Sequence, residues 1–133
     1  MCLDDQDVEF EGKNMEAVTI ILAFMNRHVN TYITAPTSSN ADALCPVLLL
    51  LSLMCKSNKL IRQYCRLKVL PPLKRNDLLR LPQQGNQLRN KLVRLMTDDH
   101  LQLKRLSAQF LFVLCKESVK RLIKYTGKLT HNY

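Results

Sequence analysis

Basic side chains with helical spacing are the residues of this sequence best suited to chemistry. Lys59, Arg62 and Arg66 recur at intervals of three and four residues, which places them on one face of a helix. Two further basic groups follow along the chain. The first consists of Arg89, Lys91 and Arg94, and the second of Lys104 and Arg105. Clustered guanidinium and ammonium groups bind carboxylates and phosphates, although each of these side chains could also belong to a solvated outer face. The pattern predicts a binding site for an anionic partner.

A second candidate surface runs along the helix expected over residues 100–116. Arg105, Gln109, Phe112 and Lys116 follow one another at helical spacing beside the expected core residues. An aromatic side chain between polar neighbours can anchor a peptide helix in a groove. Phe112 could equally pack beneath a further repeat, and the sequence leaves both interpretations open.

Motifs for catalysis and metal binding are missing from the sequence. It contains no glycine-rich phosphate loop, no zinc-protease motif and no nucleophile elbow. The three histidines lie on separate elements without a cysteine or acidic partner at ligand spacing. The five cysteines form no C-x-x-C pair and lie mostly among apolar residues, which predicts small core residues in a reducing compartment. We therefore expect neither an enzyme nor a cofactor or metal.

The net charge of +9 is divided unevenly along the chain. Residues 1–55 carry two basic and seven acidic side chains, a net −5, whereas residues 56–133 carry 18 basic and four acidic side chains, a net +14. The basic part predicts an anionic partner. Aromatic residues make up only 6%, include no Trp and do not alternate with basic residues, so no nucleic acid partner is expected. The rival hypothesis is a basic helical scaffold that binds RNA or anionic lipid.

The elements that position these residues are expected to be helices, because glycine and proline are few and no segment alternates like a strand. Apolar periodicity predicts helices near residues 14–32, 44–56, 59–68, 73–81, 88–96, 100–116 and 118–125. Asn58 should cap the third helix and Asp98-Asp99 the sixth, while Gly127 should end the last. Residues 34–40 are predicted to form a linker, which would put Pro46 in the first turn of the second helix.

Two features predict a cytoplasmic chain without a transmembrane segment. The apolar run over residues 44–55 is shorter than the roughly 20 residues of a membrane span, so a buried helix is expected there. The acidic start of the chain has neither the basic nor the apolar region of a signal peptide.

An internal repetition indicates the architecture. A long apolar helix, a Cys-Lys pair, a polar turn and a short basic helix occur at residues 47–66 and again at 108–125. Repeated helical units bury their faces against neighbouring units. We therefore predict an all-α fold, a fragment of an armadillo/HEAT-like helical-repeat solenoid. Its expected parts are an acidic lead-in (1–13), the helical repeats (14–127) and a divergent tail (128–133).

Several segments resemble the synembryn family, the "resistance to inhibitors of cholinesterase" proteins. They are FEGKNMEAVTIILAF (10–24), VLPPLKR (69–75), LRNKLVRLMT (88–97), KRLSAQFLFVLC (104–115) and ESVKRLIKYTG (117–127). The resemblance covers about residues 10–127 and corresponds to the later part of the family's repeat domain.

The resemblance implies a chaperone and guanine-nucleotide exchange factor for the G-protein α subunit, GDP-bound or nucleotide-free. Such a protein acts by binding, without covalent chemistry, and would be recruited to the cytoplasmic face of the plasma membrane at the cell cortex. In the family, a basic helix corresponding to residues 59–66 also receives a phosphorylated acidic segment that lies further along the same chain. Lys59 and Arg62 keep this basic character, whereas Gln63 replaces a usual basic residue. With the family's earlier repeats absent, we expect little exchange activity from this chain alone.

Overall fold

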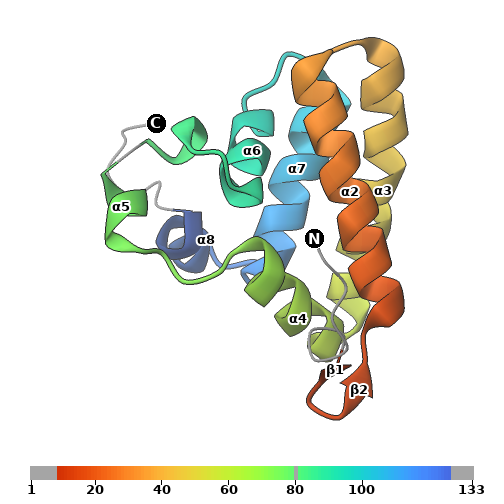
Figure 1. Cartoon of the computed structure of the whole chain (residues 1–133), viewed down its shortest axis with the longest axis vertical. Helices are drawn as coiled ribbons and strands as arrows, with labels where there is room; N and C mark the ends of the chain where they lie inside the picture. The colour runs from red at the N-terminus through yellow and green to blue at the C-terminus, as the bar shows by residue number, and fades with distance from the viewer. Residues whose placement is uncertain (1–8, 80, 127–133) are drawn as a thin grey trace.

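Helices dominate the computed structural model, which describes residues 9–79 and 81–126 (Figure 1). They are α2 (Glu16–Thr34), α3 (Ser38–Ser57), α4 (Lys59–Val69), α5 (Arg75–Leu78), the 3-10 helix η1 (Pro82–Gln84), α6 (Leu88–Leu95), α7 (Leu101–Leu114) and α8 (Val119–Thr126). The predicted helical fold is confirmed. Gly127 and the tail at residues 128–133 lie outside the described residues.

One short hairpin precedes the helices, in the segment assigned to the acidic lead-in. Strand β1 (Glu9–Phe10) pairs antiparallel with β2 (Lys13–Asn14). The two turn residues, Glu11 and Gly12, have positive φ angles of 50° and 80°, as a tight two-residue hairpin turn requires. Strands of two residues are too short to show alternation of apolar and polar side chains, so sequence patterning does not predict them. The Phe10 ring packs edge-on against Tyr64 of α4 at 5.8 Å between ring centroids, which anchors the hairpin.

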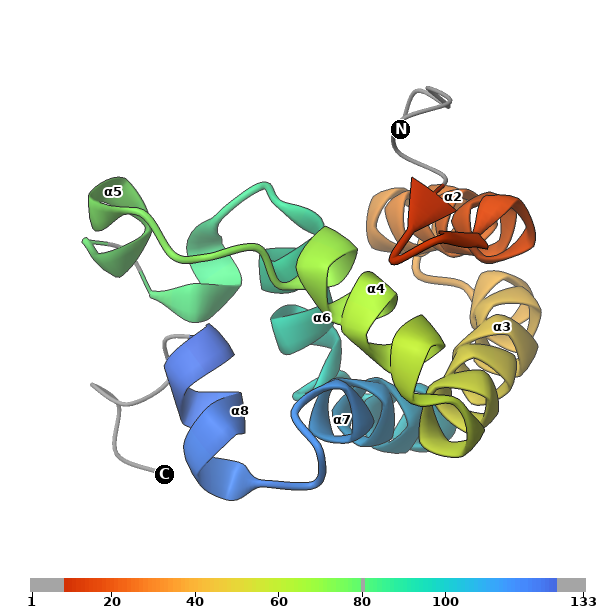
Figure 2. The ribbon, with the colours of Figure 1, turned by 90° about the horizontal axis from the view of Figure 1, so that it is seen from below.

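The long helices form two similar units (Figure 1). In each unit one helix runs up, the next runs down and a short basic helix follows at the lower end: α2, α3 and α4 in the first, α6, α7 and α8 in the second. Helices α3 and α7 pack against each other and join the units. In the view from below, α4 crosses this end, with α2 and α3 to one side and α5 and α8 to the other (Figure 2). This arrangement fits the internal repetition; a longer solenoid remains a prediction.

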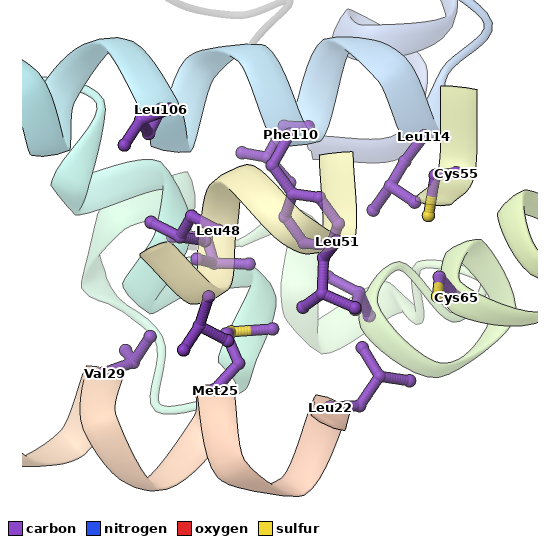
Figure 3. Close-up of a cluster of buried hydrophobic side chains, with 14 of the residues drawn as sticks. Leu22, Met25, Val29, Leu48, Leu51, Cys55, Cys65, Leu106, Phe110 and Leu114 are labelled. Atoms are coloured by element: carbon purple, nitrogen blue, oxygen red, sulfur yellow. The ribbon is translucent and has the colours of Figure 1, made fainter. Parts of the chain in front are cut away.

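The core lies where α2, α3 and α7 meet (Figure 3). Helix α2 contributes Leu22, Met25 and Val29 at the predicted spacing, and Phe110 of α7 is fully buried against α3. The four described cysteines (Cys45, Cys55, Cys65 and Cys115) are buried free thiols, which confirms them as small core residues. Burial raises the pKa of the Cys115 thiol to about 11, so this thiol stays protonated and unreactive near neutral pH.

Helix α3 begins six residues earlier than predicted, so the expected linker over 34–40 is wrong beyond Thr37. The Thr37 side chain accepts a hydrogen bond from the Asn40 backbone amide (3.1 Å) and thereby caps the helix. Pro46 consequently lies inside α3 rather than in its first turn. With 20 residues, α3 is long and apolar enough to cross a membrane by length and composition alone, and 44% of its most apolar window is buried inside the structure. The expectation from the shorter apolar run over residues 44–55 therefore does not hold for the whole helix.

The caps of the other helices follow the sequence only in part. Asn58 caps α4 as predicted, accepting from the Ile61 amide at 3.1 Å. The predicted cap of the last long helix is wrong: His100 takes that position, and its Nδ1 accepts from the Leu103 amide at 3.2 Å. Asp98 instead accepts a hydrogen bond from the Tyr32 hydroxyl (2.6 Å) and another from the His100 amide (2.9 Å). The helix predicted over 73–81 is confined to the four residues of α5.

Three polar bridges join α2 to helices later in the chain. The first is a hydrogen bond of 2.6 Å between the hydroxyls of Thr19 on α2 and Tyr64 on α4. In the second, the Lys91 ammonium of α6 donates to the Asn30 side chain of α2 at 2.6 Å. The bond between Tyr32 and Asp98 ties the end of α2 to the turn before α7. Helix α2 therefore contacts both units directly.

Replacing Tyr32 by phenylalanine should reveal the third bridge through its pH dependence. Burial and then the hydrogen bond to Asp98 raise the pKa of Tyr32 to about 12 from its ordinary 10.0. The bridge therefore stabilises the fold fully below pH 10, and the stabilisation is lost as the pH rises from 10 to 12. We expect Tyr32→Phe to lower the free energy of unfolding by about 1–2 kcal/mol at pH 7 and to flatten its decline between pH 10 and 12, measured by urea titration. An equal decline in both proteins would contradict this assignment.

Candidate binding surface

The predicted basic stripe of α4 lies next to the end of α3. Lys59 is exposed, whereas Arg62 and Arg66 are half-buried. The Arg62 guanidinium lies 3.5 Å from the Cys55 carbonyl oxygen and donates to it, so it helps to satisfy the last turn of α3. Gln63 lies on the same helix and adds no charge.

Lys116, which follows the end of α7, lies in the field of four other cations. Its pKa is lowered from its ordinary value, first by the positive charge of Arg121 and then by desolvation and by the charges of Lys59, Arg62 and Arg66. We call these five residues the basic cluster; they are Lys59, Arg62, Arg66, Lys116 and Arg121. Three separate elements thus concentrate positive charge in one place, which favours binding of an anion.

A shallow hollow of about 190 Å³ lies within this surface. It is lined by Lys56, Arg62, Val113, Lys116 and Glu117. Lys56 and Lys116 belong to the two repeated Cys-Lys pairs, so the repetition in the sequence brings two lysines to one hollow. Glu117 lies 3.8 Å from the Lys56 ammonium, and both side chains are largely exposed. The hollow can therefore accept a carboxylate or phosphate in competition with Glu117.

The backbone at this hollow is strained. Lys116 and Glu117 have φ angles of 55° and 56°, in the left-handed region that favours glycine. Two backbone hydrogen bonds hold the turn, from the Lys116 amide to the Val113 carbonyl (3.0 Å) and from the Glu117 amide to the Phe112 carbonyl (2.8 Å). Each non-glycine residue in this region costs about 1 kcal/mol, and the strain lies where the cations gather.

The other predicted site residues lie away from the basic cluster. Lys104, Arg105 and Gln109 are exposed on α7, with Phe112 half-buried. On α6, Arg94 is half-buried and the Lys91 ammonium is bound to Asn30. These α7 residues can extend a binding surface toward Lys116, whereas Lys91 already joins α6 to α2.

Arg89 lies inside the protein, with only 1% of its surface exposed. Its guanidinium donates to the Pro71 carbonyl (2.6 Å) and to the Gln87 side chain (2.8 Å), and lies 3.5 Å from an Asp77 carboxylate oxygen. Burial lowers the pKa of Arg89, while the charge of Asp77 opposes that shift. Arg89 therefore holds the segment around α5 in place and does not belong to the basic cluster.

Sequence reasoning missed Arg121, Lys56 and Glu117. Arg121 reaches the basic cluster because the left-handed turn after α7 directs α8 back toward α4, and spacing alone does not reveal such a turn. The repeated Cys-Lys pairs were the available signal for Lys56, since equivalent positions of two packed units can meet.

Known proteins similar to this chain identify its family. The family described as "Guanine nucleotide exchange factor synembryn" matches residues 2–127, which include every described helix. The chain belongs to the synembryn family. The resemblance predicted from the sequence is thus confirmed, and the family activity, nucleotide exchange, is not covalent catalysis.

Members of the synembryn family with similar sequences come from several vertebrates. Chaperone Ric-8A of Gallus gallus is 45% identical over 120 residues, which are 90% of this chain and 21% of that protein. Chaperone Ric-8B of Rattus norvegicus is 44% identical over 118 residues, 89% of this chain and 21% of the relative. Chaperone Ric-8A of Xenopus laevis is 42% identical over 135 residues, 96% of this chain and 24% of the relative. The chain thus spans less than a quarter of the length of these relatives.

Proposed function

We propose that this chain contributes a binding surface for a G-protein α subunit, in the manner of a chaperone and guanine-nucleotide exchange factor. Membership of the synembryn family and the names of its chaperone relatives support this proposal. Such a protein needs no covalent chemistry: by holding a GDP-bound or nucleotide-free partner in an opened conformation, it favours loss of GDP. The location that goes with this function is the cytoplasm, with recruitment to the plasma membrane at the cell cortex.

The basic cluster is the observation that carries the proposal. Five cations from α4, the end of α7 and α8 gather around Lys116, and two of them, Arg62 and Lys116, line a hollow of about 190 Å³. The left-handed backbone of Lys116 and Glu117 sets the position of the Lys116 side chain. An acidic or phosphorylated protein segment matches this surface in charge. The exposed α7 residues Arg105 and Gln109, with Phe112, would extend the contact. Because the chain spans less than a quarter of its relatives, we expect it to bind weakly and to accelerate GDP release little by itself.

Binding of the chain to purified Gα, GDP-bound and nucleotide-free, tests this proposal by biolayer interferometry. We expect Arg62→Glu to weaken binding about tenfold or more, because it reverses a charge within the basic cluster. Lys13→Glu is the matched control, since it reverses an exposed charge on the hairpin. Lys116→Gly should also weaken binding, yet raise stability by about 0.5–1 kcal/mol, because it removes the cation and relieves the positive φ. GDP release is measured with the same proteins.

Four results would overturn the proposal in different ways. Absence of Gα binding, or equal binding by the Arg62→Glu variant, would remove the assigned surface. Strong acceleration of GDP release would contradict the expected weakness of the chain alone. Filter binding of RNA with a steep salt dependence, without capture of Gα, would favour the rival scaffold.

A further inference from the structure

A larger and more apolar hollow lies beyond the basic cluster, between α4, α5 and α8. Its volume is about 490 Å³, within the range of roughly 300–1,000 Å³ typical of sites that hold ligands. It is lined by Arg66, Leu67, Leu70, Pro72, Leu73, Leu78 and Lys124. We call it the leucine groove. Five of these seven residues are apolar, in contrast to the polar lining of the smaller hollow.

Two leucines of the groove present their side chains to solvent. Leu67 on α4 is 46% exposed and Leu78 on α5 is 64% exposed. Proline residues shape this wall, because Pro71 and Pro72 end α4 and turn the chain toward α5. The Arg89 contacts to Pro71 and Asp77 then fix α5 beside the turn. The groove is therefore a formed feature of the fold with an accessible apolar wall.

The charged residues around this groove are mostly cations. Arg66 and Lys124 line it, and Lys74 and Arg75 are exposed at the start of α5. The carboxylate of that helix, Asp77, is engaged by the Lys74 amide (2.8 Å) and by Arg89. An occupant therefore meets apolar side chains in the groove and positive charge at its rim.

We propose that the leucine groove binds an acidic amphipathic helix of a partner protein. Leucine-like side chains at helical spacing would enter the groove, and flanking glutamates or aspartates would face Arg66 and Lys124. This proposal does not depend on Gα, and only Arg66 is shared with the basic cluster. A second copy of the chain offers a poor match, because no helix in the described part of the chain carries more than one acidic residue.

A synthetic peptide serves as the probe. It is a fluorescein-labelled helix of about 16 residues with leucines at positions i, i+3, i+4 and i+7 and glutamates on the remaining face; its counterpart has lysines in place of the glutamates. Fluorescence polarisation with the full chain should show the acidic peptide binding at least tenfold more tightly than the lysine peptide. The difference should shrink as salt is added, because screening weakens the contacts at the rim.

Matched variants locate the binding. Leu67→Gln and Leu78→Gln should each weaken binding of the acidic peptide about fivefold or more, since each loses the burial of an apolar side chain. Leu50→Gln on α3 is the control, because Leu50 is also 46% exposed and should have no effect beyond twofold. Lys124→Gln should weaken binding about threefold, while Lys13→Gln should not. Thermal melts confirm that every variant keeps the fold.

Four results would overturn the proposal. They are no binding of the acidic peptide, equal binding of the lysine peptide, equal losses from Leu67→Gln and Leu50→Gln, and a concentration-dependent dimer that Leu67→Gln dissociates. The last result would assign the groove to a second copy of the chain. Binding to phosphatidylserine vesicles that Leu67→Gln abolishes, without peptide binding, would assign it to a membrane instead.

Discussion

Replacing Phe110 with alanine is expected to lower the free energy of unfolding by about 3–5 kcal/mol, the largest effect of any single core substitution in this chain. Phe110 has no exposed surface and lies at the contact between α7 and α3, which joins the two units (Figure 3). Deleting its ring removes apolar contacts and leaves a cavity that two packed long helices can fill only in part. Because small domains are stabilised by only about 5–15 kcal/mol, this substitution should remove much of the stability.

Urea titration followed by circular dichroism measures this effect. Phe24→Ala is the matched control, since Phe24 is exposed on α2, where its ring contacts His28 in a tilted arrangement and lies beneath Arg27. We expect the control to lose about 1 kcal/mol or less, because surface aromatic and cation–π contacts contribute little. Equal losses from both substitutions would mean that the contact between α3 and α7 does not hold the units together.

Replacing Arg89 with alanine should have the second largest effect, a loss of about 3 kcal/mol or more. The substitution leaves the Pro71 carbonyl and the Gln87 side chain without their donor and Asp77 without its ion pair. Removing the buried member of a charged network is strongly destabilising, because its partners lose their contacts and the space of its side chain is left unfilled. Arg89→Lys should restore only part of the loss, since a single ammonium cannot reproduce the planar guanidinium contacts.

Hydrogen exchange can show that this effect is local as well as global. Amides of residues 74–79 should exchange faster in Arg89→Ala, because Arg89 links Pro71 and Asp77, on either side of the start of α5, to α6. Arg75→Ala is the control, since Arg75 is exposed on the same short helix. Unchanged exchange across residues 74–79 in the Arg89→Ala protein would show that another contact holds this segment.

The periodicity of the sequence predicts the helices well where local chemistry decides their ends. Asn58 marks the start of α4, and the spacing of Leu22, Met25 and Val29 marks the buried face of α2. Both signals depend only on residues within one or two helical turns of each other. The start of α3 was missed because Thr37 and the two serines after it suit both a linker and a cap. Asp98 was misassigned because its partner, Tyr32, lies far away in the sequence.

The sequence predicts that the candidate site is basic, but it does not predict which basic side chains come together there. The basic stripe on α4 follows from residue spacing alone. Arg121 joins it because Lys116 and Glu117 adopt left-handed φ angles, which their residue types do not predict. Arg89 belongs to the same basic group as Lys91 and Arg94, which are half-buried, yet it is fully buried, because Pro71 and Asp77 approach it from earlier in the sequence. Contacts between remote residues decide whether a basic side chain binds a partner or supports the fold.

The three polar bridges of α2 have a consequence for how the molecule comes apart. A linear stack of repeats can lose its units one at a time, because each unit touches only its neighbour. Here one helix is fastened to α4, to α6 and to the turn before α7. Under mechanical tension α2 would have to release both units before either could open freely. The chain should therefore unfold cooperatively in a single step rather than one repeat unit at a time.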